Sequence, residues 1–193
     1  MKKGEYGFID ESKQLKLNIS AAFIVVIAIL STVILAVYGT RSNYWIVIPI
    51  ILALPFAKFL VSYLMVRPFR SMSKDAHGYV ENNIKDMDHI ATIYDATLAS
   101  EDGVSFLDLV LLYDGNVYAS RGYGNKKYSK EDITNYLKRI VKRAGYDRKV
   151  YVFEGSKETV DTFVKHMASH NADHEPDDKC TKNIRSAIIN LGV

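Results

Sequence analysis

The sequence predicts a membrane-anchored α/β (α+β) protein, in which an N-terminal pair of helices precedes a small domain. Two observations predict this class: two long apolar stretches within residues 19–66, and a later succession of helix-type and strand-type patterns. A helix of about twenty residues spans the roughly 30 Å hydrocarbon core of a bilayer. We therefore expect a transmembrane hairpin, followed by a three-stranded or slightly larger sheet flanked by helices.

The hairpin is expected to consist of helices over residues 19–38 and 44–66, joined by a connection short enough to force an antiparallel reversal. The only charge within either stretch is Lys58. It lies about 12 Å from Val66 along a helix, so its long side chain can reach the membrane surface. The other interpretation of Lys58 is an ion or lipid contact within the membrane, as in an accessory subunit of a transport complex.

Basic residues near the helix ends predict the orientation, because positively charged loops stay on the cytoplasmic side. Lys2, Lys3, Lys13 and Lys16 precede the first helix, and Arg67, Arg70 and Lys74 follow the second. The connection contains one basic residue, Arg41. We expect a two-pass protein of the plasma (inner) membrane with both termini cytoplasmic. The single cysteine, Cys180, fits a reducing compartment. A cleaved signal peptide is the alternative for the first stretch, but that stretch is longer than a signal core and a second span follows.

Outside the hairpin, the chain divides into three further segments. Residues 1–18 show no clean period and are expected to be a loosely ordered N-terminal cytoplasmic segment. Residues 67–100 are expected to form a juxtamembrane helix, because apolar residues recur there at spacings of three and four. These are Val80, Ile84, Met87, Ala91, Tyr94 and Leu98. Residues 101–193 are expected to form the cytoplasmic α/β domain.

Local signals order the elements of that domain. Residues 105–113 and 117–119 flank the turn sequence Asp114-Gly115-Asn116 and predict a β-hairpin. Ser129 and Asp132 predict a capping box at the start of a helix. A strand over 149–153, a helix capped by Ser156 and a last helix over 181–191 follow.

Charge is unevenly distributed along the chain. Residues 75–114 contain nine acidic residues and one basic residue, whereas residues 121–149 contain ten basic and three acidic residues. The basic stretch predicts a surface for phosphate groups of anionic lipids or of nucleic acid. The alternative is a solvated helix face, or one that lies over the acidic helix. The residues singled out for this surface are Arg121, Lys126, Lys127, Lys138, Arg139, Lys142 and Arg143.

The stretch from Leu107 to Gly155 resembles, in element order, the core of restriction-endonuclease-like nucleases. In that family, an Asp on one hairpin strand and an acid-x-Lys triplet on the next strand hold a divalent metal. Asp108 matches the first acid, and Glu81 could match a supporting one. The triplet is missing, since Ala119, Ser120 and Arg121 occupy its place. The resemblance implies a nuclease-derived fold that has lost catalysis, because a Mg²⁺ site without its second carboxylate lacks a main ligand.

Three histidines, His166, His170 and His174, form a weaker candidate for a metal site. Two histidines four residues apart on a helix can share one face and bind zinc. The alternative is that His166 and His170 end a polar helix and that His174 belongs to an acidic loop. We therefore predict no metal and no cofactor.

The sequence contains no P-loop, dinucleotide fingerprint or nucleophile elbow, so it does not predict an enzyme, although active sites can be assembled from distant residues. We expect an integral membrane protein that presents a cytoplasmic interaction or sensing module at the inner leaflet. The expected partners are the lipid bilayer, anionic lipids and a protein at the membrane, and self-association stays open. A membrane-tethered nucleic-acid-binding protein with a degenerate nuclease-like core is the first alternative. An accessory subunit of a membrane transport complex is the second.

Overall fold

The computed structural model describes residues 2–38, 44–100, 103–125, 128–169 and 176–190. The described residues form an α+β protein with six α-helices and one four-stranded mixed sheet. The chain divides into two compact units, of which one contains residues 11–67 and the other combines residues 1–10 with residues 68–193. We call the second unit the α/β domain.

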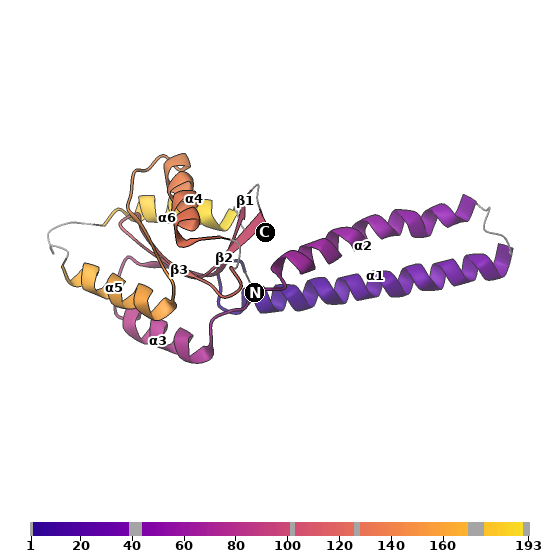
Figure 1. The fold of residues 1–193 in the computed structure, drawn as a ribbon, viewed down its shortest axis with the longest axis horizontal. Helices are drawn as coiled ribbons and strands as arrows, with labels where there is room; N and C mark the ends of the chain where they lie inside the picture. Colours follow the sequence, from indigo (N-terminus) through magenta and orange to yellow (C-terminus); the bar gives the residue numbers. More distant parts are fainter. Residues whose placement is uncertain (1, 39–43, 101–102, 126–127, 170–175, 191–193) are drawn as a thin grey trace. The chain divides into compact units, whose positions relative to one another are not determined.

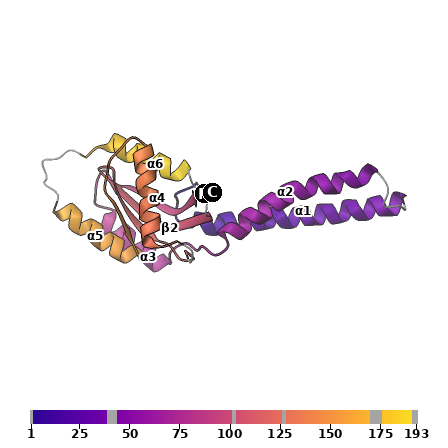
Figure 2. The same cartoon turned by 45° about the horizontal axis from the view of Figure 1, so that its top comes forward.

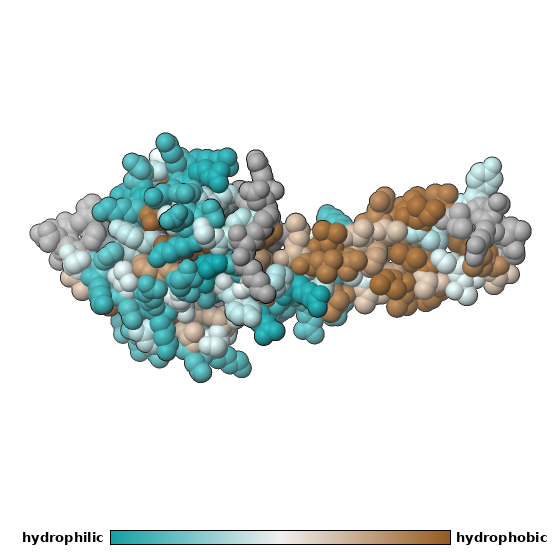
Figure 3. Space-filling view, viewed as in Figure 1, coloured by the Kyte–Doolittle hydropathy of each residue, from teal (hydrophilic) through white to brown (hydrophobic). Residues whose placement is uncertain are grey.

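The unit of residues 11–67 consists mainly of two apolar helices. Helix α1 (Phe8–Tyr38) begins eleven residues before the predicted span, and a short 3-10 turn (Tyr44–Ile46) precedes helix α2 (Val47–Val66). The two helices pack together, and the rings of Phe23 and Phe59 lie 6.1 Å apart. Both are long and apolar enough to cross a membrane, with mean hydropathies of 2.8 and 2.1 in their most apolar segments. Their surface is largely hydrophobic in Figure 3.

The sheet of the α/β domain contains strands β1 (Ala91–Ser100), β2 (Gly103–Tyr113), β3 (Asn116–Arg121) and β4 (Val150–Phe153). Its strand order is β1-β2-β3-β4. The first three strands pair antiparallel, and β4 pairs parallel to β3. The parallel step is possible because helix α4 (Lys130–Arg143) connects β3 to β4.

Helices cover both faces of the sheet (Figures 1 and 2). Helices α3 (Lys74–Ile84) and α5 (Ser156–Ala168) pack on one face, and α4 and α6 (Asp178–Asn190) pack on the other. Each face has its own apolar core. Val80, Leu109 and Phe163 are central on the α3/α5 face, while Leu107, Leu137 and Ile184 are central on the α4/α6 face.

The predicted juxtamembrane helix over residues 67–100 is right only over residues 74–84. Helix α3 ends at Ile84, and residues 91–100 form the long strand β1 instead. The β-branched residues Thr92, Ile93 and Thr97 favour the strand. Pairing with β2 satisfies its backbone, and the apolar cores on the two faces of the sheet bury Ile93 and Leu98 on one side and Tyr94 on the other. The helical spacing was misleading because apolar residues on both faces of a buried strand can coincide with a spacing of three and four.

Two of the predicted local signals are confirmed. Asp114 and Gly115 have φ angles of 48° and 74°, as a tight hairpin turn between β2 and β3 requires. Ser129 and Asp132 form the reciprocal capping box of α4. The cap predicted for α5 differs, because Gly155 occupies the cap position and Ser156 is the buried first residue of the helix.

Candidate functional site

The candidate site is built around an irregularity at which β1, β2 and β3 lose their regular pairing. The register of β1 and β2 passes from the pair Tyr94–Leu109 to the pair Ala96–Leu107, so Asp95 and Asp108 face each other without belonging to the ladder. The register between β2 and β3 shifts at the same place. Asp95 adopts a φ angle of 51°, which a non-glycine residue rarely takes. The bulge thus brings two carboxyl groups together inside the sheet.

Asp95 is almost fully buried and joins three segments of the chain. Its Oδ2 atom accepts hydrogen bonds from the backbone amide of Ile9 at 3.2 Å and from the hydroxyl of Ser71 at 2.5 Å. Burial raises the pKa of Asp95, and the charge of Asp10 adds to this effect, whereas the bonds from Ser71 and Ile9 oppose it. The first turn of α1 and the chain after α2 are therefore both hydrogen-bonded to β1 through one carboxyl group.

Asp108 lies on the neighbouring strand and is the most strongly perturbed acid of the described chain. Burial raises its pKa to about 6, and the charge of Asp95 adds to the rise, while the Ser120 hydroxyl and nearby backbone amides oppose it. Its Oδ1 atom is buried and has no hydrogen-bond partner within the described residues. A partly buried carboxyl group with such a pKa is a candidate for a functional role.

An open hollow of about 420 Å³ adjoins Asp108, and we call it the Asp108 cleft. It is lined by Asp108, Arg121, Gly122, Tyr123, Gly124, Asn125 and Glu154. These residues include the carboxyl ends of the parallel strands β3 and β4, which is where open α/β sheets commonly bind ligands. The sequence did not indicate Glu154, because its place beside Arg121 depends on the pairing of β3 with β4.

Charged and amide side chains fix the walls of the Asp108 cleft. Arg121 makes an ion pair with Glu154, with Nη1 3.0 Å from Oε2, and also donates to the carbonyl oxygen of Asn125. The buried Asn125 side chain accepts from the Phe106 amide at 2.7 Å and donates to the carbonyl oxygens of Phe106 and Gly122. The loop after β3 is thereby attached to the edge of β2.

The residues near Asp108 do not complete the metal site of the nuclease resemblance. At the position of the missing triplet, β3 places the Ser120 hydroxyl and the Arg121 cation beside Asp108. The cleft does contain a second carboxylate, Glu154, but Glu154 is ion-paired with Arg121. Glu81 does not line the cleft, and its carboxylate instead accepts a hydrogen bond from the Tyr94 hydroxyl at 2.5 Å. Among the residues that the structure describes, no cluster of three or more His, Cys, Asp or Glu side chains could hold a metal ion.

Of the three candidate histidines, the structure describes His166. His166 lies in the last turn of α5, where its Nδ1 atom is 3.1 Å from the Tyr118 hydroxyl and its ring contacts Tyr118 and Tyr151. His170 and His174 lie outside the described residues. His166 therefore belongs to an aromatic cluster in the part of the chain that can be described.

The predicted basic surface divides into two places. Arg121 belongs to the Asp108 cleft, whereas Lys138, Arg139, Lys142 and Arg143 lie exposed along α4 and form what we call the α4 basic face. None of these four makes an ion pair with an acidic side chain of the described chain, and Arg139 lies over the ring of Tyr136 at 5.3 Å. The acidic helix α3 packs on the opposite face of the sheet, so the alternative that it covers the basic helix is wrong. Lys126 and Lys127 lie outside the described residues.

Within the other unit, Lys58 is an exposed residue of α2, on a helix whose surface is otherwise apolar. No carboxylate of the described chain forms an ion pair with it.

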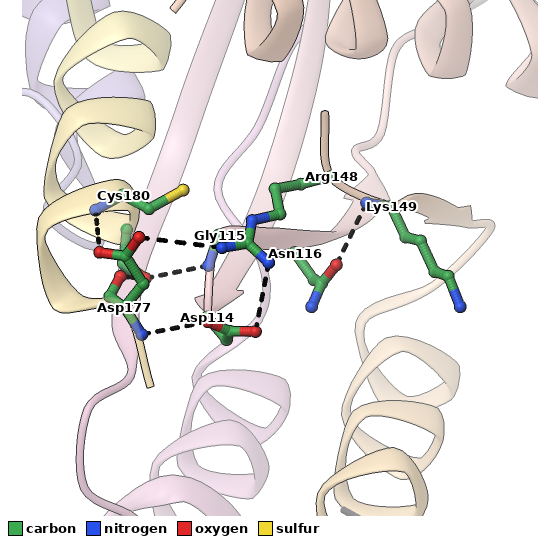
Figure 4. A network of polar contacts seen from close by, with 8 residues as sticks. Asp114, Gly115, Asn116, Arg148, Lys149, Asp177 and Cys180 are labelled. Atoms are coloured by element: carbon green, nitrogen blue, oxygen red, sulfur yellow. Dashed lines mark hydrogen bonds and ion pairs between the residues drawn. The ribbon is translucent and has the colours of Figure 1, made fainter. Parts of the chain in front are cut away.

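A second polar cluster joins the β2–β3 turn to α6 (Figure 4). Arg148 lies between two carboxylates, with Nη1 3.5 Å from Asp114 and Nη2 3.8 Å from Asp177. Asp177 also donates its backbone amide to Asp114 at 3.0 Å and accepts from the amide of Cys180 at 2.9 Å, which caps α6. A side chain at Gly115 would meet the Cys180 sulfur at 2.4 Å, so the turn and the helix are in close contact.

No family model, no curated protein and no solved structure matches the chain. The class that the fold defines is therefore an α+β protein with two apolar helices that could cross a membrane.

Proposed function

We propose that this chain is a two-pass protein of the plasma membrane that holds the α/β domain at the cytoplasmic leaflet, where the α4 basic face binds anionic lipid headgroups. The observation that carries the proposal is the α4 basic face itself, with four exposed basic side chains and no ion pair to a described acid. A basic residue near an anionic membrane surface contributes about 1 kcal/mol to binding. The domain would act as an interaction or sensing module for partners at the membrane.

The orientation rests on the distribution of basic residues. Four lysines precede the first span and three basic residues follow the second, against one arginine in the connection. Single-cysteine variants of the full chain, in a Cys180→Ser background, test the orientation. Labelled with a membrane-impermeant maleimide, Asn43→Cys should react only from the outside and Lys85→Cys only from the inside. The opposite pattern would overturn the proposed orientation.

Vesicle flotation tests the lipid-binding role. The soluble protein consists of residues 1–10 joined by a flexible linker to residues 68–193, because these residues form one compact unit. It should bind vesicles that contain about 30% anionic lipid, and it should bind more weakly as the salt concentration rises. Changing Lys138, Arg139, Lys142 and Arg143 to glutamine should weaken binding at least about tenfold.

The matched control replaces four exposed lysines elsewhere on the α/β domain, namely Lys149, Lys165, Lys179 and Lys182, by glutamine. It removes the same charge but leaves the α4 basic face intact. Equal losses in the two variants would mean that only net charge matters, and the specific role of α4 would be wrong.

The second candidate is a membrane-tethered nucleic-acid-binding protein with a degenerate nuclease-like core. It is favoured by the element order α3-β1-β2-β3-α4-β4 and by Asp108, which lies in a cleft at the position that the resemblance gives to the first acid. Fluorescence anisotropy of labelled duplex DNA across a salt series tests binding. Binding without Mg²⁺-dependent cleavage is expected, since Ala119, Ser120 and Arg121 stand where the acid-x-Lys triplet is needed. Cleavage that disappears in Asp108→Asn would establish an enzyme instead.

A further inference from the structure

A second hollow, of about 430 Å³, lies at the opposite ends of β3 and β4 from the Asp108 cleft. It is lined by Asp114, Asn116, Tyr118, Asp147, Arg148, Lys149, Tyr151, His166 and Ser169. Pockets for small molecules commonly have volumes of about 300–1,000 Å³. Since the lining comes from β3, β4, α5 and two loops, its shape depends on the packed domain and not on one flexible segment.

Alternation along two paired strands arranges the lining into an aromatic row and a polar row. Tyr118 pairs in register with Tyr151, and Asn116 and Lys149 lie two residues before them on the same face. The two tyrosine rings stack with centroids 5.1 Å apart at 23°. Asn116 accepts a hydrogen bond from the backbone amide of Lys149 at 3.1 Å, which aligns the polar row.

His166 completes the aromatic part of the hollow. Its ring lies edge-on to both tyrosines, with centroid distances of 5.6 Å and 5.3 Å. Burial raises the pKa of Tyr118 to about 12. The Tyr118 hydroxyl lies 3.1 Å from Nδ1 of His166, so this hydrogen bond occupies Nδ1 and leaves Nε2 as a second polar atom of the ring beside the aromatic surface.

The charges of the lining largely cancel. Arg148 is held by Asp114 and Asp177, as Figure 4 shows, and this leaves Lys149 and Asp147 as an exposed cation and an exposed acid. A strongly anionic ligand would gain little here. A neutral ring that carries both donors and acceptors would find partners of each kind in Lys149, Asp147 and Asn116.

We propose that this hollow binds a free nucleoside, through contact of the heterocycle with Tyr151 and His166 and of its polar edge with Asp147 and Lys149. Nucleobases combine a flat π surface with several donors and acceptors, and aromatic side chains bind this surface with little dependence on the base. Nucleic acid is a poorer candidate for this hollow, because binding a phosphate backbone requires an excess of cations.

Isothermal titration calorimetry of the full-length protein in lipid nanodiscs tests the proposal, with adenosine, guanosine, cytidine and uridine as probes. At least one nucleoside should bind saturably, and the triphosphate of that nucleoside should bind no more tightly than the nucleoside itself. Tyr151→Leu should weaken binding at least about tenfold, in line with the loss of one aromatic stacking partner. Tyr123→Leu, which changes an exposed tyrosine outside this hollow, should bind as the wild type does.

A second variant protects the test against misfolding of Tyr151→Leu. Asp147→Asn combined with Lys149→Met alters only exposed rim residues and should also weaken binding at least about tenfold, by removal of partners for the polar edge of the base. Absence of saturable binding for all four nucleosides would overturn the proposal. So would tighter binding of the triphosphate, or wild-type affinity in the rim variant.

Discussion

Asp108 is a residue whose ionised form is disfavoured in the folded protein. Its partly buried carboxyl group lies where the pairing of β1, β2 and β3 becomes irregular, and the buried acid Asp95 lies opposite it across the β1–β2 pair. Desolvation disfavours the ionised form of each group, so the folded protein binds protons that an unfolded chain would release. The stability of the folded protein therefore depends on pH, and the groups responsible are these two side chains of the sheet.

The direction of this dependence follows from the two pKa values of Asp108. Its ordinary pKa is 3.8, and its pKa in the fold is about 6. As the pH rises through this window, the folded state loses the proton that stabilises it relative to the unfolded chain, and the loss is complete above about pH 7. One pKa unit corresponds to about 1.4 kcal/mol, which limits the effect of Asp108 to about 3 kcal/mol. Asp95 contributes in the same direction, since its pKa is also raised.

We predict that Asp108→Asn makes the protein more stable than the wild type at pH 7.5, by about 1–3 kcal/mol, and flattens the pH dependence. Thermal unfolding followed by circular dichroism between pH 4.5 and 8, at intervals of about half a unit, measures both effects. The exposed Asp86, changed to Asn, serves as the control and should leave the profile unchanged. If stability falls with rising pH as steeply in Asp108→Asn as in the wild type, Asp108 is not the group responsible for the pH dependence.

Asn125 is predicted to be important for stability although no sequence signal singled it out. Asn125→Ala removes three hydrogen bonds and leaves the amide of Phe106 without its side-chain acceptor, whereas the carbonyl of Phe106 keeps the hydrogen bond from the amide of Gly122. A buried group left unsatisfied costs about 1–3 kcal/mol, so a loss of about 1–3 kcal/mol is expected in chemical denaturation. Tyr123→Ala, at an exposed neighbour in the same loop, should change stability by less than about 0.5 kcal/mol.

Asp108 could be singled out from the sequence because it interrupts an apolar strand. The residues that surround Asp108 could not be predicted from the sequence. Asp95 was part of a predicted helix, and its role appears only when the bulge in β1 pairs with β2. Asn125 and Glu154 similarly acquire their partners through strand pairing between residues far apart in the chain. A spacing pattern carries no information about such pairing.

Among the elements, α4 is the one whose sequence specifies both its start and its buried face. Ser129 accepts from the amide of Asp132 at 3.1 Å, and Asp132 accepts from the amide of Ser129 at 2.9 Å. Ile133, Leu137, Ile140 and Val141 are buried against the sheet, as the period of the sequence predicts. This agreement made α4 predictable, whereas β1 was not, since its pattern is consistent with a helix.

We predict that Ser129→Ala destabilises the α/β domain by about 1 kcal/mol, because it removes the side-chain cap of α4. Ser156→Ala provides the comparison at the start of α5, where the cap position is Gly155 and no side-chain cap exists. The two variants can be compared by hydrogen exchange of the first amides of each helix. Faster exchange should be confined to the start of α4 in Ser129→Ala, and equal exchange in the wild type and this variant would refute the capping role.

At the scale of the whole molecule, the N-terminal segment was expected to be loosely ordered, but residues 4–10 complete the α/β domain. The carbonyl oxygen of Gly4 accepts from the amide of Tyr94 at 2.9 Å, and Tyr6 stacks on His77 with centroids 4.0 Å apart. Ile9 is 1% exposed. The first ten residues therefore belong to the same unit as residues 68–193, although the two apolar helices separate them in sequence.

We predict that Ile9→Ala destabilises the α/β domain by about 2–4 kcal/mol, as expected for truncation of a buried isoleucine. Leu15→Ala changes a residue that is 62% exposed and should have little effect on that domain. Limited proteolysis of the full chain in nanodiscs reports the difference as a faster cleavage within residues 68–193. Equal cleavage rates for the two variants would show that the domain is stable without its N-terminal segment.

The carboxyl group of Asp95 also has a mechanical consequence. Ile9, in the first turn of α1, and Ser71, in the chain after α2, both donate hydrogen bonds to the same oxygen atom of Asp95. A load on either of these two segments would therefore be shared with the other through one residue in a bulge of β1. Loss of the Asp95 carboxylate should weaken the hold of the α/β domain on both segments at once, while Gly4, Tyr6 and Phe69 keep their own contacts with the domain.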